Sequence, residues 1–150
     1  MLKETGFYKQ LKLIYEQQSK SVEVGFYEDA PKYDDGESVT NVAFHNEYGG
    51  IGELSDGPIA IPPRPFMSKS FSESKGILNA SFNENKTDIV KALKETGEKV
   101  QSVIRKNILD WSTPPNSQRT IAYKGFNNPL YHTGNMVNSV RYKIAGKDES

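Results

Sequence analysis

The sequence predicts an α+β domain: a small antiparallel sheet packed against one long helix and several shorter ones, joined by extended loops. Two observations predict this class. Apolar residues recur at helical spacing through residues 86–111, a single stripe over about seven turns. Two distant segments, residues 21–27 and 139–145, alternate between apolar and polar residues, as half-buried strands do.

The long helix carries the clearest pattern. Its stripe advances in steps of three and four and consists of Ile89, Leu93, Gly97, Val100, Ile104, Ile108 and Trp111. A glycine on the stripe costs about 1 kcal/mol relative to alanine, so Gly97 indicates either close approach of another element or a weak point of the helix. The Pro114-Pro115 pair ends this helix.

The two strands are expected to form the sheet. In the first, Val22, Val24 and Phe26 alternate with Glu23 and Gly25. In the second, residues 140–144 alternate strictly between apolar and basic side chains, which is typical of a strand with one wet face. A short helical turn is expected just before it, with Thr133 as N-cap.

Three further helical segments are expected. Residues 7–19 form a short amphipathic helix, and residues 38–49 form a helix capped by Ser38 and ended by Gly49. Consecutive prolines at positions 62, 63 and 65 make a stiff extended entry into a third segment. That segment has helical spacing up to Phe82 and is interrupted at Gly76, so it is either one helix or two.

The remaining residues are expected in loops of a single domain that spans residues 1–150. Residues 50–61 carry glycine, proline and acids without a period, which predicts a flexible exposed loop that orders against a partner. Residues 118–130 are polar, and the tail at residues 146–150 is expected to be frayed.

Composition narrows the functional classes. Hydrophobic residues make up 35%, a low share that indicates long polar loops or surfaces buried against other subunits. Nineteen basic and nineteen acidic residues balance, so no global field attracts nucleic acid or membranes. The absence of cysteine excludes disulfides, thiol nucleophiles and cysteine zinc sites. Neither a signal peptide nor a membrane span is recognisable, which predicts a soluble protein that stays where it is made.

Catalytic chemistry is not expected. His45 and His132 lie in different elements without metal-ligand spacing, and no nucleophile elbow, phosphate loop or dinucleotide fingerprint is present. The acids at residues 28–29 and 34–35 lack the spacing of a calcium loop. We therefore expect no enzyme activity, no cofactor and no metal. A hydrolase or metal-dependent enzyme would need both histidines and carboxylates to converge in one pocket; His45 is otherwise expected to be half-buried and bonded to the backbone.

A nucleic-acid-binding module is the main alternative from charge. Its basic side chains are Arg119, Lys124, Arg141 and Lys143, and gathering on one face would favour it. The zero net charge favours a solvated strand face instead.

Three sequence blocks occur in an order that is informative when they are taken together; the third block has two parts. Residues 42–49 read Val-Ala-Phe-His-Asn-Glu-Tyr-Gly, and residues 61–67 read Ile-Pro-Pro-Arg-Pro-Phe-Met. After the long helix come Pro-Pro-Asn-Ser at residues 114–117 and Asn-Pro-Leu-Tyr-His-Thr-Gly-Asn-Met-Val-Asn-Ser-Val at residues 128–140. This order resembles the minor tail, tail-completion and neck proteins of long-tailed bacteriophages and prophages. His132 departs from that pattern, which more often has aspartate there.

The resemblance implies a structural protein of the virion rather than an enzyme. Such proteins assemble in the cytoplasm of the host bacterium and join the tail to the head-side connector as a ring of identical subunits. The implied partners are copies of the chain, the head–tail connector, tail tube or tail terminator proteins, and DNA in the channel, with no membrane.

The subunit and partner contacts are expected in three regions: the loop at residues 50–61, the Arg-Pro-Phe anchor and the segment at residues 114–130. Low apolar content beside stiff, proline-bounded segments motivates this expectation. The alternative for the anchor is that Phe66 is an ordinary core residue and Arg64 an ordinary surface residue. The candidate interface residues are Arg64, Pro65, Phe66, Lys124, Asn128, Leu130, Thr133 and Met136.

Overall fold

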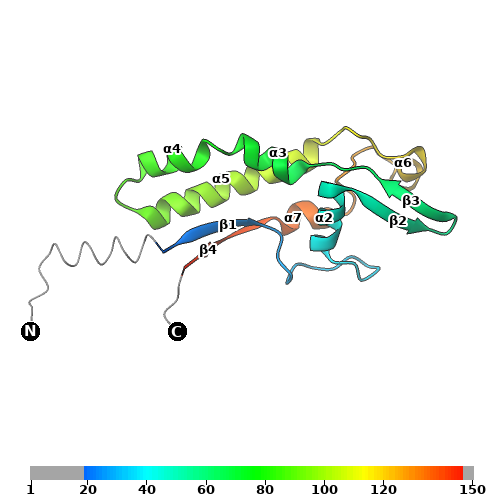
Figure 1. Cartoon of the computed structure of the whole chain (residues 1–150), viewed down its shortest axis with the longest axis horizontal. Helices are drawn as coiled ribbons and strands as arrows, with labels where there is room; N and C mark the ends of the chain where they lie inside the picture. The colour runs from blue at the N-terminus through cyan, green and yellow to red at the C-terminus, as the bar shows by residue number, and fades with distance from the viewer. Residues whose placement is uncertain (1–18, 147–150) are drawn as a thin grey trace, which may run out of the picture.

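The computed structural model describes residues 19–146 and confirms the α+β class. The elements form three layers around one long helix, α5 (Ile89–Asp110). Two short helices, α3 (Phe66–Glu73) and α4 (Ile77–Glu84), cover one side of α5. A ribbon of β1 (Ser21–Gly25) and β4 (Arg141–Ala145) covers another side (Figure 1).

The β1–β4 ribbon confirms the expected pairing of two strands from opposite ends of the sequence. The strands are antiparallel, and their register places Val22 opposite Ile144 and Val24 opposite Tyr142. Glu23 faces Lys143 on the exposed side, so the ribbon has the wet face expected from its alternation.

The apolar stripe of α5 is buried from Leu93 to Ile108 and half-buried at Ile89 and Trp111, and Gly97 explains how the ribbon packs on it. A β-carbon at Gly97 would lie 2.6 Å from Cγ of the Tyr142 ring. The ring therefore occupies the space that a side chain would take, and the glycine permits close approach of β4 to the helix. The expectation of another element at this position is confirmed.

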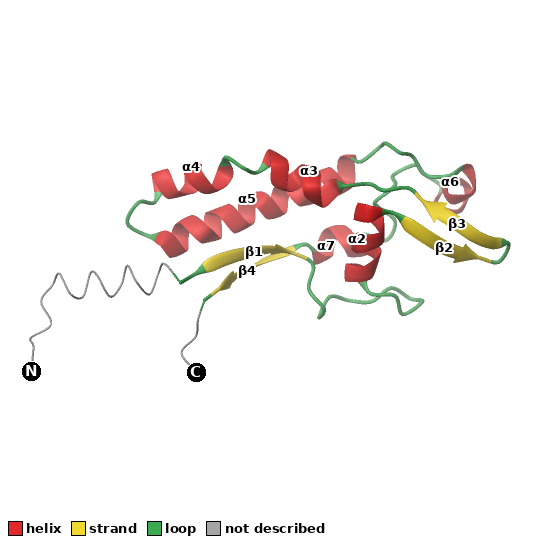
Figure 2. Cartoon of the chain, viewed as in Figure 1, coloured by secondary structure: helices red, strands yellow, loops and turns green. Residues whose placement is uncertain are grey.

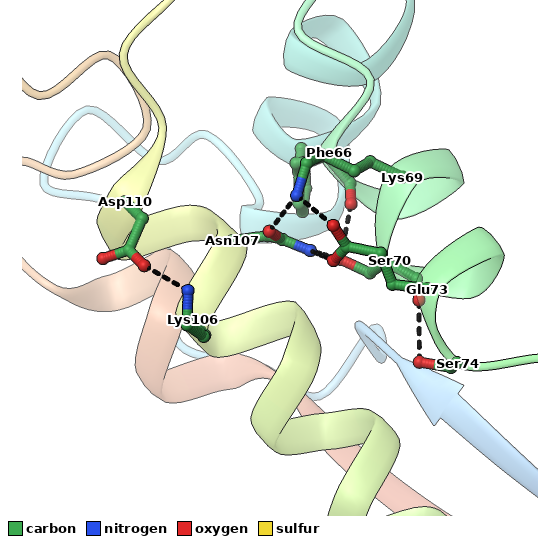
Figure 3. Close-up of polar contacts among 8 residues, drawn as sticks. All are labelled: Phe66, Lys69, Ser70, Glu73, Ser74, Lys106, Asn107 and Asp110. Atoms are coloured by element: carbon green, nitrogen blue, oxygen red, sulfur yellow. Dashed lines mark hydrogen bonds and ion pairs between the residues drawn. The ribbon is translucent and has the colours of Figure 1, made fainter. Parts of the chain in front are cut away.

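A polar network joins α3 to the opposite side of α5 (Figure 3). Asn107 is buried on α5, and its amide donates to Oγ of Ser70 and to the Glu73 carboxylate, both at 2.8 Å. Nζ of Lys69 donates to the side-chain oxygen, Oδ1, of Asn107 at 2.7 Å. Because each buried polar atom of Asn107 has a partner, the network fixes the alignment of α3 on α5 at little cost.

The helix α2 (Val39–Tyr48) begins and ends as predicted. Oγ of Ser38 accepts from the Asn41 backbone N–H at 3.1 Å, and Gly49 follows with φ 74°. The helix contributes to a core shared with α3, α5, the short helix α7 (Asn135–Ser139) and nearby loops. The buried core consists of Val39, Ala43, Phe66, Val100, Ile104, Ile108, Leu130, Met136, Val137 and Val140.

The prediction of an irregular loop at residues 50–61 is wrong. These residues form an antiparallel hairpin of β2 (Gly50–Leu54) and β3 (Gly57–Ile61), connected by two residues, Ser55 and Asp56. The Asp56-Gly57 pair is a hairpin signal, and Gly57 takes a φ of 115° that favours glycine. The hairpin projects from the layered body beside α6 (Gln118–Lys124) (Figure 1).

Two smaller expectations are corrected. The polar segment at residues 118–130 contains α6, which begins where Oγ of Ser117 accepts from the Thr120 N–H at 3.2 Å. The N-cap of α7 is Gly134 rather than Thr133, although Oγ1 of Thr133 accepts from the Asn135 N–H at 3.4 Å. The expected extended loops are present between β1 and α2 and on both sides of α6 (Figure 2). The helix expected at residues 7–19 lies outside the described residues except for Ser19, as does the tail from residue 147.

Candidate functional site

Arg64 is the centre at which the three sequence blocks meet. Its side chain is buried, with 6% of its surface exposed. Its Nε donates to the Pro114 carbonyl at 3.1 Å and its Nη2 to the Pro115 carbonyl at 3.2 Å. Its Nη1 donates to Oδ1 of Asn46 at 3.4 Å, and its backbone N–H to the Asn46 carbonyl at 2.6 Å. One guanidinium thus joins the end of α2 to the turn that follows α5.

Glu47, the neighbour of Asn46, makes the second link between blocks. Its buried carboxylate accepts from the backbone N–H of Met67 at 2.8 Å and of Ser68 at 3.0 Å, and also from the Ser68 hydroxyl. These N–H groups lie in the first turn of α3, which has no side-chain cap of its own. A carboxylate at this end is favoured by the orphan N–H groups and by the helix dipole.

Gly49 completes the contact between the first two blocks. A β-carbon there would lie 2.8 Å from the Ile61 carbonyl oxygen and 3.0 Å from the Pro63 nitrogen. The positive φ and this close approach both require glycine. The Asn-Glu-x-Gly block therefore forms the surface on which the proline-rich block packs.

Lys124 and Asn128 order the third block. Nζ of Lys124 donates to the carbonyls of Asn128 at 3.1 Å and Tyr131 at 2.8 Å. Oδ1 of Asn128 accepts from the backbone N–H of Leu130 and Tyr131, while its amide donates to the Leu109 carbonyl at 2.6 Å. The segment between α6 and α7 is thereby tied to the end of α5.

The centre is cationic. Burial lowers the pKa of Arg64 and of Lys124 from their usual ranges, and the Arg64 charge lowers the pKa of Lys124 further. Arginine nevertheless stays charged. None of the ion pairs within residues 19–146 includes either residue; their recorded partners are neutral oxygens.

A groove of about 590 Å³ opens beside this centre, between β3 and α6. Arg64 and Asn116 contribute to its lining, and the Asn116 amide nitrogen is buried without a protein partner. At its outer side Arg119 pairs with Asp56 at 2.9 Å, and Tyr123 is 81% exposed. The groove is therefore an open depression lined by both cationic and apolar side chains, next to the β2–β3 hairpin.

The structure separates the predicted interface residues into three groups: buried, half-buried and exposed. Phe66, Leu130 and Met136 are core residues with at most 5% exposure, and Arg64 is buried as well. Their side chains hold the domain together. Lys124 and Asn128 are half-buried and bonded within the chain, whereas Pro65 and Thr133 are exposed.

The four basic residues of the nucleic-acid alternative do not gather on one face. Arg119 and Lys124 lie on α6, whereas Arg141 and Lys143 lie on β4, toward the other end of the elongated domain (Figure 1). Arg141 pairs with Asp29, and Nζ of Lys143 lies 4.0 Å from the centroid of the Tyr27 ring.

The histidines and acids also stay apart from a common site. His45 is half-buried, and its Nδ1 has no protein partner, so the expected bond to the backbone at this atom is not formed. His132 is exposed, with its ring 5.6 Å from that of Tyr123. Across residues 19–146, no three His, Asp or Glu side chains form a group that could hold a metal ion. No described helix is both long and apolar enough to cross a membrane.

The sequence patterns assigned no role to Asn46, Glu47 or Tyr123, and they placed Arg119 only among the basic side chains of the nucleic-acid alternative. The first two belong to a quoted block, but their partners lie about twenty residues away and have no local signal. The other two depend on α6, whose available signal was the Ser117 cap with Thr120 three positions later. Comparison with protein-family models, with curated proteins and with solved structures gives no match to this chain.

Proposed function

We propose that the chain is a structural virion protein of the neck, or head-proximal tail end, of a tailed bacteriophage. In this role it joins or completes the tail for attachment to the head connector and has no catalytic activity. It assembles in the cytoplasm of the host bacterium and becomes part of the particle. Its partners are copies of itself in a ring, the connector, and tail tube or terminator proteins, around a channel that DNA enters.

One observation carries this proposal: the three blocks behind the resemblance meet around Arg64. Residues far apart in sequence, in the segments 46–49, 61–68 and 114–115, contact one another through Arg64, Glu47 and Gly49. These contacts make the blocks depend on one another, because each block supplies the hydrogen-bond donor or acceptor that a group in another block requires. A set of blocks that must occur together is expected of a family with a common architecture.

The arrangement also suits assembly. The contacts of Arg64, Glu47 and Gly49 fix the base of the β2–β3 hairpin and leave its tip and α6 exposed. Apolar side chains lie open in this region, including Ile51 at 76% and Tyr123 at 81%. Exposed apolar side chains that gather at one end of a domain are typical of a surface that a partner covers.

The test is association with neck and tail components. The purified chain would be examined by light scattering alone, at high salt, with duplex DNA, and with head–tail connector and tail tube proteins. We expect a closed ring, or a monomer that assembles when those proteins are supplied. A stable monomer that binds DNA in a salt-dependent way and ignores the connector and tail proteins would overturn the proposal in favour of nucleic-acid binding.

A matched pair of variants locates the contact. Ile51→Ser removes an exposed apolar side chain from the hairpin, and Leu78→Ser removes one that is 42% exposed on α4. We expect weaker assembly with connector or tail proteins for the first variant and unchanged assembly for the second. Equal effects would contradict a role for the hairpin.

A further inference from the structure

The walls of the groove between β3 and α6 come from two segments without any acidic residue. No aspartate or glutamate occurs in residues 57–72 or 111–147. Arg64 and Arg119 line the groove, and the carboxylate that pairs with either of them within the described chain is that of Asp56. That pair is exposed and therefore contributes little, so an incoming carboxylate can replace it.

The matching negative charge lies in the loop between β1 and α2. Residues 28–37 carry five acids and one lysine, and all five acids are exposed: Glu28, Asp29, Asp34, Asp35 and Glu37. Asp34 and Asp35 form no ion pair within residues 19–146. Although the chain has no net charge, it separates an acidic loop from a basic groove.

The acidic loop has a defined shape at its tip. The Gly36 N–H donates to the Tyr33 carbonyl and the Tyr33 N–H to the Glu37 carbonyl, both at 2.9 Å. Oδ1 of Asp35 accepts from the Glu37 N–H at 3.0 Å. Asp34 and Asp35 therefore stand on a closed turn, and presenting them to a partner costs little ordering.

We propose that the groove between β3 and α6 receives the Asp34-Asp35 turn of a second copy of the chain. The turn's carboxylates face Arg119 and the Arg64 wall, while Tyr123 and the aliphatic residues of β3 cover the rest of the turn. Two different surfaces meet in this contact, so it is heterologous and propagates head to tail, as ring formation requires. The inference specifies the subunit contact within the proposed function.

Charge reversal tests this contact by the oligomeric state of the full chain. Sedimentation and light scattering would follow the mass from micromolar to millimolar concentration at low and high salt. We expect Arg119→Glu, and separately the double variant Asp34→Lys/Asp35→Lys, to weaken association by about tenfold or more, because like charges then face each other. Lys94→Glu makes the same charge change at an exposed position on α5 and is expected to leave association unchanged.

Mixing gives the sharpest test. The acidic groove of Arg119→Glu fits the reversed loop of Asp34→Lys/Asp35→Lys, and the unchanged groove of the second variant fits the unchanged loop of the first. Each variant alone should stay small, and an equimolar mixture should assemble. Asp56→Asn should strengthen self-association of the otherwise unchanged chain, because it removes the carboxylate that competes for Arg119.

A chain that stays monomeric at every concentration and salt overturns this inference, as does a mixture that fails to assemble or an Arg119→Glu variant that matches Lys94→Glu. A monomer that still binds connector and tail proteins overturns the inference and leaves the neck proposal standing. Self-association through the groove without binding to the connector and tail proteins would support this inference and contradict the neck proposal.

Discussion

Residues 19–146 form two antiparallel ribbons of two strands each, and the two ribbons have different roles. The β1–β4 ribbon joins distant parts of the sequence and packs on α5, where Tyr142 fills the space at Gly97. The β2–β3 hairpin is local, and it exposes Ile51 and Ile59. Because an isolated two-stranded hairpin is only marginally stable in water, the second ribbon depends on its attachment at the base and on what covers it.

The base of the hairpin explains how an exposed ribbon keeps a fixed position. Gly49 allows the chain to pass against Ile61 and Pro63, and Arg64 follows directly with its bonds to Asn46 and the Pro114–Pro115 carbonyls. One ribbon thus contributes to the stability of the domain, while the other is held out as a surface. Three predictions test this difference, from the largest expected effect to the smallest.

Ile104→Ala should destabilise the domain most. Ile104 is fully buried on α5, so truncation removes apolar contact and leaves a cavity, at a cost of about 2–5 kcal/mol. Ile51→Ala, the same kind of truncation in the hairpin, should change the free energy of unfolding by less than about 0.5 kcal/mol. Urea unfolding followed by circular dichroism compares the two; similar losses would break the distinction between the ribbons.

Arg64→Met keeps an unbranched apolar side chain of about the length of the arginine stem but removes the guanidinium and its donors. The carbonyls of half-buried Pro114 and exposed Pro115 lose their donor. An unpaired acceptor that water does not reach costs about 1–3 kcal/mol, so we expect a net loss of about 1–3 kcal/mol. Arg119→Met alters the other groove arginine, whose exposed pair is worth about 0–1 kcal/mol. Equal unfolding midpoints for both variants would show that Arg64 does not hold the blocks together.

Gly97→Ala places a methyl group against the Tyr142 ring. Overpacking of this kind costs about 1–3 kcal/mol, and the loss should be smaller than that of Ile104→Ala if the ring can shift. Gly76→Ala is the matched control, because nothing lies within 4 Å of its position and its φ is −82°. Thermal unfolding that ranks Gly76→Ala as the more damaging change would contradict the packing of β4 on α5.

The elements with strong local patterns were predictable. The α5 stripe, the two alternating strands and the Ser38 cap all follow from periodicity or from one side-chain bond, and the structure confirms each. Even the contact at Gly97 could be anticipated, because a glycine on a buried helical face has few other reasons to be there.

The hairpin was missed because its composition hides its geometry. Glycine occupies alternate positions in β2, and β3 begins with the adjacent pair Gly57-Pro58, so residues 50–61 show no apolar period, although Asp56-Gly57 marked the turn. The helix α6 was missed because it lacks a buried stripe; it has no buried residue at all.

The site could be predicted only in part. The candidate interface residues included Arg64, Lys124 and Asn128, but their positions in the sequence gave no sign that their side chains bond within the chain. The burial of Arg64 depends on carbonyls fifty residues later, and such long-range partners leave no local trace in one sequence. The groove, in turn, arises only after the hairpin and α6 are in place.

Native-state hydrogen exchange at low protein concentration tests the central distinction most directly. The account predicts that ladder amides of β1 and β4 exchange only through global unfolding, whereas those of β2 and β3 exchange through local opening with a clearly smaller free energy. Raising the concentration until the chain associates should slow exchange in β3 and α6 and leave β4 unchanged. Equal protection of both ribbons in the monomer would contradict the account.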